Sequence, residues 1–284
     1  MARYGTWAPP AWWKDFRIDS PRNLSALWKL AGKPEYSAYR GLSDPKYELT
    51  PRVARISNHV KNEWNMMADF LAYARSHGHH LNNRLELLAL AQHHGLPTRC
   101  MDVTTAFGVA LYFAVSGKPC ARGAMVWCID LEAMPRVAVR WYEKHHQDGA
   151  NGLRCEYQVF PSLPALVERE VVPLLRHDEV DQQIDRYMTN STKARHPPII
   201  VSTPHISRRM TAQDANFSVI DPNGGHLASQ LKEIECNDVL RGIWLSPKLC
   251  SAVKNHLQVI GITRRVLFPD IDNLAADIAD RYAA

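Results

Sequence analysis

The chain has 284 residues, of which 46% are hydrophobic and 22% charged, and these globular proportions exclude collagen, coiled-coil and disordered proteins. This length predicts one domain with additions, or two small domains. The longest apolar run, residues 106–115, has about half the length that a bilayer crossing needs, and no basic-then-apolar leader opens the sequence. We therefore expect a soluble, cytoplasmic protein without membrane contact.

The cysteines and histidines favour no covalent or metal framework. Six cysteines are scattered without a Cys-x-x-Cys pair. The histidine clusters at residues 77–80 and 145–146 lack the i, i+4 pair with an intervening Glu that helical zinc sites use. We predict neither disulfides nor a metal site.

The net charge of +5 lies at the N-terminus. Residues 1–55 hold ten Lys and Arg against five acids, whereas the rest of the chain has 24 of each, and four of the eight tryptophans lie in this stretch. Basic groups between aromatic side chains suit single-stranded nucleic acid. The candidate contacts are Trp12, Trp13, Arg17 and Arg22. The alternative is a basic and aromatic segment, residues 1–35, that its tryptophans pack onto the body of the protein.

Three helix starts share one signature, a hydroxyl residue followed by proline, at Ser20-Pro21, Thr50-Pro51 and Ser246-Pro247. The second start predicts a long amphipathic helix that ends near Gly78, with a stripe of Ile56, Val60, Trp64, Met67, Leu71 and Ala74. Further helices are predicted at about 82–94, at 106–115, and at the C-terminus, where Ile271, Leu274, Ile278 and Tyr282 share one face.

Short stretches rich in Val, Ile and aromatic residues predict strands at 36–41, 125–131, 157–160, 199–206, 216–220 and 240–245. Helices cluster early and strands late, without regular alternation. This order predicts an α+β fold rather than a doubly wound sheet. We expect one compact domain over residues 36–284, with a helical insertion around 163–190.

Common nucleotide-binding and hydrolase motifs are absent from the sequence, but three polar segments stand out. Tyr39-Arg40-Gly41 ends a predicted strand, where an arginine beside a glycine can grip phosphate. Residues 92–105 crowd hydrogen-bonding side chains between two apolar helices. Residues 208–217 connect two predicted strands and read alone as a hairpin connection.

The segment 92–105 is the most informative of the three. Burying polar groups unpaired costs about 1–3 kcal/mol each, so its side chains must bond one another or a ligand. Thr104 or Thr105 is the predicted N-cap of the apolar helix, which would gather hydroxyl and N–H groups for an anion or a ribose. The alternative is a turn network in which Asp102 pairs with Arg99.

Together these segments resemble the FRG domain family, named for an aromatic-Arg-Gly motif. The residues that carry the resemblance are Tyr39-Arg40-Gly41, Gln92-His93-His94-Gly95-Leu96-Pro97-Thr98-Arg99-x-x-Asp102-x-Thr104, Ala110-Leu111-Tyr112-Phe113-Ala114, Arg209-Met210-x-Ala212-Gln213-x-x-x-Phe217 and Leu267-Phe268-Pro269-Asp270-Ile271. The resemblance spans about residues 36–275.

The FRG family is similar in motif order to ADP-ribosyltransferases of the Arg–Ser–Glu type, which implies a single domain of that kind with a split, mixed or antiparallel sheet. In those enzymes an arginine holds NAD, a Ser/Thr motif supports the nicotinamide pocket, and a glutamate bonds the ribose 2′-hydroxyl. The resemblance assigns these roles to Arg40, Thr104 and Gln213. Gln213 departs from the pattern because an amide carries no negative charge. Asp102, Asp214 or the substrate would then supply the charge, or NAD would be bound with little turnover.

The resemblance implies an NAD-dependent ADP-ribosyltransferase that uses NAD as co-substrate and no metal. The implied catalytic residues are Arg40, Thr104, Gln213 and Asp102, and the implied NAD-binding residues are Arg40, Gly41, His94, Thr98, Arg99, Thr104 and Thr105. A toxin or anti-phage effector is expected, with an antitoxin protein as a partner. The 23 arginines against 11 lysines favour nucleic acid, RNA above all, over a protein as acceptor. The alternatives are an NAD glycohydrolase and a non-catalytic nucleotide- or RNA-binding module.

Overall fold

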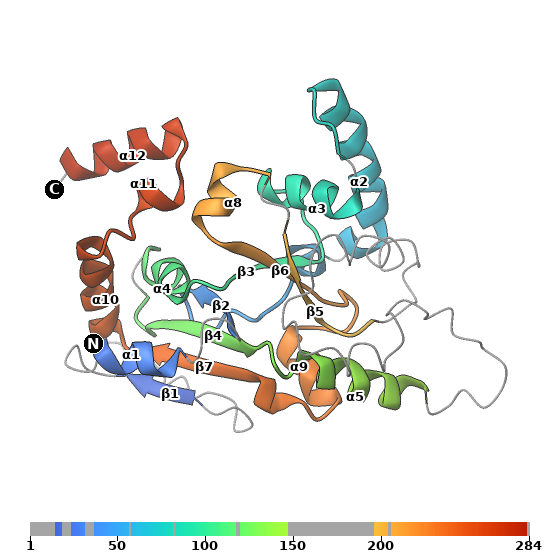
Figure 1. Cartoon of the computed structure of the whole chain (residues 1–284), viewed down its shortest axis with the longest axis horizontal. Coiled ribbons are helices and arrows are strands. Elements are labelled where there is room, and N and C mark those ends of the chain that lie inside the picture. The colour runs from blue at the N-terminus through green and yellow to red at the C-terminus, as the bar shows by residue number, and fades with distance from the viewer. Residues whose placement is uncertain are drawn as a thin grey trace.

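A computed structural model describes residues 15–18, 24–31, 37–56, 58–81, 83–117, 120–146, 196–203 and 206–282. Its centre is a seven-stranded sheet of order β1-β7-β4-β2-β3-β6-β5 (Figure 1). The strands are β1 (Asp15–Ile18), β2 (Ser37–Leu42), β3 (Cys100–Thr104), β4 (Ala124–Asp130), β5 (Ile199–Ser202), β6 (Ala215–Val219) and β7 (Leu240–Leu245). β1 runs parallel to β7, and the other neighbouring pairs are antiparallel. The predicted α+β class is confirmed.

The sheet is nearly divided between β2 and β3. β2 pairs with β4 over six residues, but with β3 it shares the single register pair Tyr39–Thr104. β3 pairs with β6 along its whole length, and β6 pairs with β5. Two blocks, β1-β7-β4-β2 and β3-β6-β5, thus meet at one residue pair and separate beyond it.

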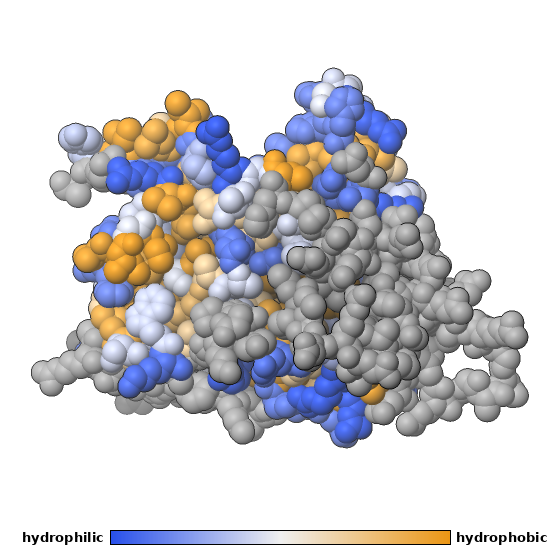
Figure 2. Space-filling view, viewed as in Figure 1, coloured by the Kyte–Doolittle hydropathy of each residue, from blue (hydrophilic) through white to orange (hydrophobic). Residues whose placement is uncertain are grey.

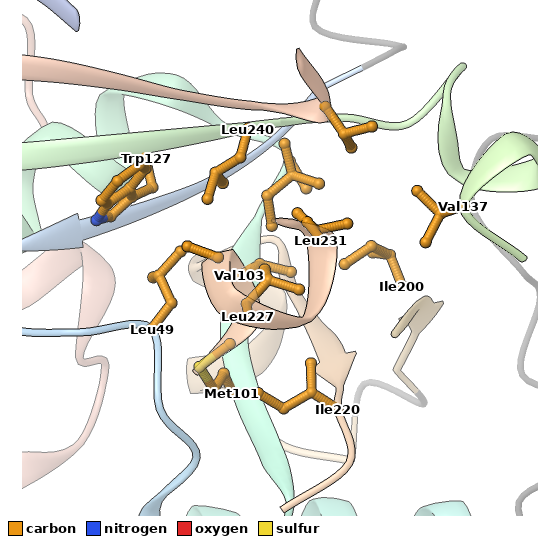
Figure 3. Packing of buried hydrophobic residues seen from close by; sticks show 14 of the residues in the cluster. Leu49, Met101, Val103, Trp127, Val137, Ile200, Ile220, Leu227, Leu231 and Leu240 are labelled. Atoms are coloured by element: carbon orange, nitrogen blue, oxygen red, sulfur yellow. The ribbon is translucent and has the colours of Figure 1, made fainter. Parts of the chain in front are cut away.

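One face of the sheet carries a single apolar core that continues across this division. Helices α5 (Met134–His146) and α9 (Leu227–Glu233) cover it. Figure 3 shows side chains from both blocks converging on α9, and its labelled residues are Leu49, Met101, Val103, Trp127, Val137, Ile200, Ile220, Leu227, Leu231 and Leu240. This shared core joins the two blocks where strand pairing does not.

The opposite face carries two separate cores. Helices α1 (Leu24–Leu30), α4 (Phe107–Val115) and α10 (Pro247–Val259) pack on β2, β4 and β7. Helices α2 (His59–Ser76), α3 (Arg84–His93) and α8 (Arg208–Ala212) pack on β3, β5 and β6. The C-terminal helices α11 (Arg264–Leu267) and α12 (Ile271–Tyr282) project on one side of α8, and α2 projects on the other (Figure 1). The space-filling view shows a notch between these projections (Figure 2).

The helix predicted from Thr50-Pro51 is in fact two elements. A 3-10 helix, η3 (Arg52–Arg55), ends at Ile56, whose φ of −129° and ψ of 119° are extended, and α2 begins only at His59. The buried face of α2 contains Met67 and Ala74 of the predicted stripe, but it differs from that stripe at other positions. Glu63 is buried, whereas Trp64 is 45% exposed.

Other predicted helices agree within a few residues. α10 begins after Ser246, whose hydroxyl accepts the Leu249 N–H at 3.2 Å, and has Pro247 in its first turn. α3 begins after Asn83, and α4 and α12 correspond to the predicted apolar and C-terminal helices. Helices α5 and α9 and the short 3-10 helix η4 (Asn237–Val239) were not predicted.

The strands predicted at 36–41, 125–131, 216–220 and 240–245 are confirmed as β2, β4, β6 and β7, and the one at 199–206 ends early, at Ser202. Strand β3 was missed because its residues were interpreted only as part of a polar segment. Met101 and Val103 point into the core while Asp102 is exposed, which is the alternation of a strand. The segment 208–217 likewise contains α8 rather than a simple hairpin connection.

Several expectations concern residues beyond the described ones. The predicted strand at 157–160, the insertion around 163–190, and Trp12, Trp13 and Arg22 lie outside them, as does the side chain of Arg17. The backbone of β1, which belongs to the expected N-terminal segment, joins the sheet beside β7. Within the described ranges, no helix combines the length and apolarity that crossing a bilayer requires.

A buried ion pair fastens α2 to the segment before β3. The Glu63 carboxylate accepts hydrogen bonds from the Arg99 main-chain N–H at 2.8 Å, from Nε at 2.9 Å and from Nη2 at 2.7 Å. Glu63 is only 2% exposed. The alternative expectation that Arg99 pairs with Asp102 is therefore wrong, because the ion-pair partner of Arg99 is Glu63.

We expect Glu63→Gln to lower the free energy of unfolding by about 3–5 kcal/mol, because it removes the negative charge from a buried ion pair. Urea denaturation followed by circular dichroism measures the change. Asp69→Asn, at an exposed position of the same helix, is the matched control and should shift stability by less than about 0.5 kcal/mol. Equal effects of the two variants would contradict a structural role for the pair.

Candidate functional site

A cavity of about 140 Å³ lies where β2 and β3 separate, and we call it the split cavity. Its lining combines strand ends of both blocks with α4 and the α8–β6 connection. The lining residues are Tyr39, Arg40, Gly41, Asp102, Val103, Thr104, Ala110, Phe113, Arg209, Gln213 and Ala215. Four of the residues expected to be catalytic, Arg40, Asp102, Thr104 and Gln213, therefore line one cavity.

Arg40 spans the gap between the two blocks. Its Nη1 donates a hydrogen bond to the main-chain carbonyl of Asp102, just beyond the point where β2 and β3 stop pairing. The pKa of the Arg40 guanidinium is lowered, mainly because burial withdraws it from water; Asp102 opposes this shift and Arg55 adds to it. An arginine nevertheless stays protonated in a protein. The cavity thus contains a poorly solvated positive charge, which an anionic group of a ligand would stabilise.

Asp102 is held by a short polar network from α3. The Gln92 side-chain amide donates to the Asp102 carboxylate at 3.2 Å and to the Cys100 carbonyl at 3.2 Å. The buried Thr98 hydroxyl donates to the Gln92 side-chain carbonyl, which fixes the orientation of the amide. The network orients the Asp102 carboxylate, and this side chain remains exposed at the cavity.

Two neighbouring threonines tie the end of β3 to the residues after α8. Thr104 donates to the main-chain carbonyl of Gln213 at 2.8 Å, and Thr105 donates to the Asp214 carboxylate. The prediction that Thr104 or Thr105 is the N-cap of α4 is wrong. The N-cap is Ala106, whose N–H donates to the Thr104 hydroxyl at 3.0 Å. Both bonds join residues 109 positions apart in the chain, so they fix Gln213 and Asp214 at the cavity.

The side chain of Gln213 is oriented by the C-terminal region. Its Nε2 donates to the Leu267 carbonyl at 2.9 Å, and no described residue donates a hydrogen bond to its Oε1. The next residue, Asp214, has a φ of +45°, a left-handed conformation that is uncommon outside glycine. Strained backbone of this kind concentrates at functional sites. Gln213 therefore offers a fixed acceptor oxygen at the cavity.

Arg209 supplies the second positive charge of the split cavity. It lies four residues before Gln213, one helical turn away, and its guanidinium carbon lies 4.7 Å from the centre of the Phe268 ring. The pKa of the nearby His93 imidazole is lowered, mainly by burial, with Arg209 and His94 adding and Asp270 opposing. The described lining of the split cavity therefore contains two arginines and one acid, Asp102.

Four of the residues expected to bind NAD lie away from the split cavity. Thr98 is buried in the Gln92 network, and Arg99 is paired with Glu63. His94 is exposed and packs near Phe70, His79 and His93. Thr105 reaches the site only through Asp214. Thr98 and Thr105 thus act on the site through the residues they bond, whereas Arg99 and His94 do not line it.

Three residues at or behind the site had no role assigned to them from the sequence. Arg209 and Phe113 line the cavity, and Glu63 holds Arg99. Two signals were available in the sequence. Arg209 and Gln213 are spaced i, i+4, and Glu63 lies four residues before Met67, on the apolar side of α2. In the part of the chain that the structure describes, no three His, Cys, Asp or Glu side chains are grouped to hold a metal ion.

Gly41 lets α4 approach β2 closely enough to form the cavity wall. A Cβ atom at this position would lie 1.9 Å from the Ala110 carbonyl oxygen and 2.7 Å from the Ala114 nitrogen. Both are backbone atoms, so no side-chain rotation can relieve the clash. Gly41 is thus required for the packing of α4 on β2, whereas its neighbour Arg40 lines the site.

Part of the chain matches a known protein family. A family model described as the FRG domain matches residues 35–121, which include Arg40, the segment 92–104 and α4. The match supports the FRG family for this part of the chain; Gln213 and the segment 267–271 lie outside it. No curated protein and no solved structure matches the chain.

We expect Gly41→Ala to destabilise the protein by about 1–3 kcal/mol or more, because α4 must move away from β2 to admit the methyl group. Thermal or urea unfolding measures the loss. Gly117→Ala is the matched control, since its Cβ would approach the Ser43 side chain at 3.1 Å and a small shift would relieve it. A Gly41→Ala protein as stable as the control would show that this close approach is unimportant.

Proposed function

We propose that the protein is an NAD-dependent ADP-ribosyltransferase whose reaction takes place in the split cavity. The observation that supports this most is the convergence of Arg40, Thr104 and Gln213 on one cavity from distant parts of the chain. These are the residues to which the resemblance assigns the Arg, Ser/Thr and Glu positions of such enzymes. The FRG match covers the first two of them.

The charges of the cavity suit a dinucleotide with a pyrophosphate. Arg40 would bind its phosphate or ribose oxygens, since a guanidinium fork pairs with two oxygens at once. Arg209 also lines the cavity and adds a second cation. A cavity of 140 Å³ is smaller than the roughly 300–1,000 Å³ of pockets that enclose whole small molecules. It would therefore enclose about one ring of NAD at the reacting end, with the remainder of the dinucleotide outside.

In the proposed reaction, the bond between the nicotinamide nitrogen and ribose C1′ breaks, and its electron pair leaves with nicotinamide. A nucleophile of the acceptor then bonds to C1′ and releases its proton to water. Positive charge builds up at C1′ during this exchange. Gln213 Oε1 would accept the ribose 2′-hydroxyl proton in a hydrogen bond, and the Asp102 carboxylate would stabilise the positive charge. Thr104 acts by positioning Gln213 through its bond to that residue's carbonyl.

The acceptor is proposed to be a nucleic acid, with RNA favoured over protein, in keeping with the arginine-rich composition. A toxin or anti-phage effector with a neutralising partner would use this chemistry. Two alternatives stand beside the transferase. Transfer to water would make the protein an NAD glycohydrolase, and the uncharged Gln213 would also suit a nucleotide-binding module without turnover.

We expect Arg40→Lys to lower the release of nicotinamide from labelled NAD at least tenfold, because lysine keeps the charge but cannot form the guanidinium fork. Arg136→Lys changes a surface pair with Asp238 in the same conservative way and should leave the rate unchanged. Melting temperatures are measured in parallel, since loss of the Arg40 bond to Asp102 also costs some stability. A wild-type rate in Arg40→Lys would reject the assignment of Arg40.

We expect Gln213→Ala and Asp102→Asn each to slow nicotinamide release by an order of magnitude or more, the scale of losing a positioned polar group in a transition state. Gln213→Glu should remain at least tenfold faster than Gln213→Ala, because it keeps an acceptor oxygen and adds a negative charge. Thr211→Ala, at an exposed position of α8, is the control. Full activity of Gln213→Ala would end the analogy, and failure of the wild type to consume NAD would favour the binding module.

A further inference from the structure

A second, larger cavity lies beside the split cavity, and we call it the C-terminal cavity. It has a volume of about 890 Å³ and is lined from α4, α10, α11 and α12 and the segments between them. The lining residues are Tyr112, Phe113, Val115, Ser116, Lys254, Leu257, Gln258, Ile262, Thr263, Arg264, Arg265, Phe268, Asn273 and Asp277. Its volume is within the range of sites that hold small molecules or one unit of a polymer.

Three aromatic rings form one wall of this cavity. Tyr112 and Phe113 have ring centroids 5.8 Å apart, and Phe268 lies 6.4 Å from the first and 6.0 Å from the second. All three side chains are partly exposed instead of being closed into the core. Ring surfaces of this kind stack with nucleobases, and the stacking is tolerant of base identity.

The remaining wall is predominantly positive. Lys254 and Arg265 are exposed, and Arg264 donates from Nε to the Asn273 side chain at 3.1 Å. The lining contains three cations and one acid, Asp277. Arg264 is already engaged, so Lys254 and Arg265 are the cations best placed to meet a phosphate. A cavity with aromatic rings on one wall and cations on another matches a nucleotide in both its chemical parts.

The two cavities share a wall. Phe113 lines both of them, and Phe268 of the C-terminal cavity packs under Arg209 of the split cavity. Leu267, the residue before Phe268, accepts the hydrogen bond that orients Gln213. A group bound in the C-terminal cavity would therefore lie next to the residue proposed to bond the reacting ribose.

We propose that the C-terminal cavity binds one nucleotide of a single-stranded nucleic acid and presents it as the acceptor to the split cavity. The base stacks on the face of one ring of the Tyr112, Phe113 and Phe268 cluster and contacts the edges of the others, and the phosphate pairs with Lys254 and Arg265. The role as acceptor site rests on the proposed transferase function; nucleotide binding does not. In transfer, the nucleophilic atom of this nucleotide bonds to C1′ as the bond to nicotinamide breaks, and its proton passes to water.

The test compares reversal of the two cavity cations, Lys254 and Arg265, with a charge reversal elsewhere on α10. Lys254→Glu removes a cation from the C-terminal cavity, whereas Lys248→Glu makes the same change at an exposed position of α10 outside it. Binding of a fluorescein-labelled single-stranded RNA of ten nucleotides is measured by anisotropy at several salt concentrations. We expect Lys254→Glu combined with Arg265→Glu to weaken binding at least tenfold and to reduce the salt dependence, since phosphate contacts are lost. Lys248→Glu should stay within about twofold of the wild type.

A parallel measurement of nicotinamide release without RNA separates this inference from the proposed function. If the doubly reversed variant loses RNA binding and transfer but hydrolyses NAD at the wild-type rate, the acceptor site is supported. If NAD hydrolysis falls while RNA binding is unchanged, the cavity belongs to NAD and the inference is overturned. The inference would also be overturned if the doubly reversed variant bound RNA as tightly as the wild type. It would equally be overturned if the variant transferred ADP-ribose to a protein at the wild-type rate. If the wild type binds RNA through these residues but never consumes NAD, the nucleotide site is supported and the proposed transferase function is rejected.

Discussion

Where β2 and β3 separate, main-chain groups that a continuous ladder would pair need other partners. Arg40 supplies one, because its guanidinium donates to the Asp102 carbonyl just beyond the last register pair. The same side chain that completes the backbone hydrogen bonding therefore projects a positive charge into the gap. A full hydrogen-bond ladder between β2 and β3 would close the gap and remove the cavity. Without Arg40, the Asp102 carbonyl would lose its hydrogen-bond donor. The division of the sheet and the site are thus one feature of the fold.

The gap stays open because the two blocks are held together from other directions. On one face the core under α5 and α9 continues across both blocks. On the other face the bonds of Thr104 and Thr105 to Gln213 and Asp214 join the end of β3 to the start of β6. Gly41 allows α4 to lie against β2, which closes the cavity on a third side. None of these contacts requires pairing between β2 and β3 beyond Tyr39.

The sequence predicted the periodic parts of this fold and the residues with unusual chemistry, but not the partners of those residues. β7 and α10 were predicted closely because a short apolar and aromatic stretch and a Ser-Pro start are local signals. β3 was missed because Asp102 and the threonines hid an alternation that only five residues express. Arg99 was placed at the site, since nothing in the sequence links it to Glu63, 36 residues earlier. Long-range pairing decides whether a polar residue lines a cavity or supports it, and a single sequence does not encode that choice locally.

The neutral Gln213 is consistent with the charges that surround it. Its Nε2 donates to the Leu267 carbonyl, and an ionised glutamate could not make this bond because a carboxylate has no donor. An amide satisfies both requirements of the position, since it gives a donor to α11 and keeps an acceptor toward the cavity. The negative charge then has to come from another residue, and among the described lining residues Asp102 is the one acid. Its carboxylate is oriented by Gln92 and acts on Arg40 through space. The orienting and the charged group of the site therefore come from two different segments, Gln213 from the end of α8 and Asp102 from β3.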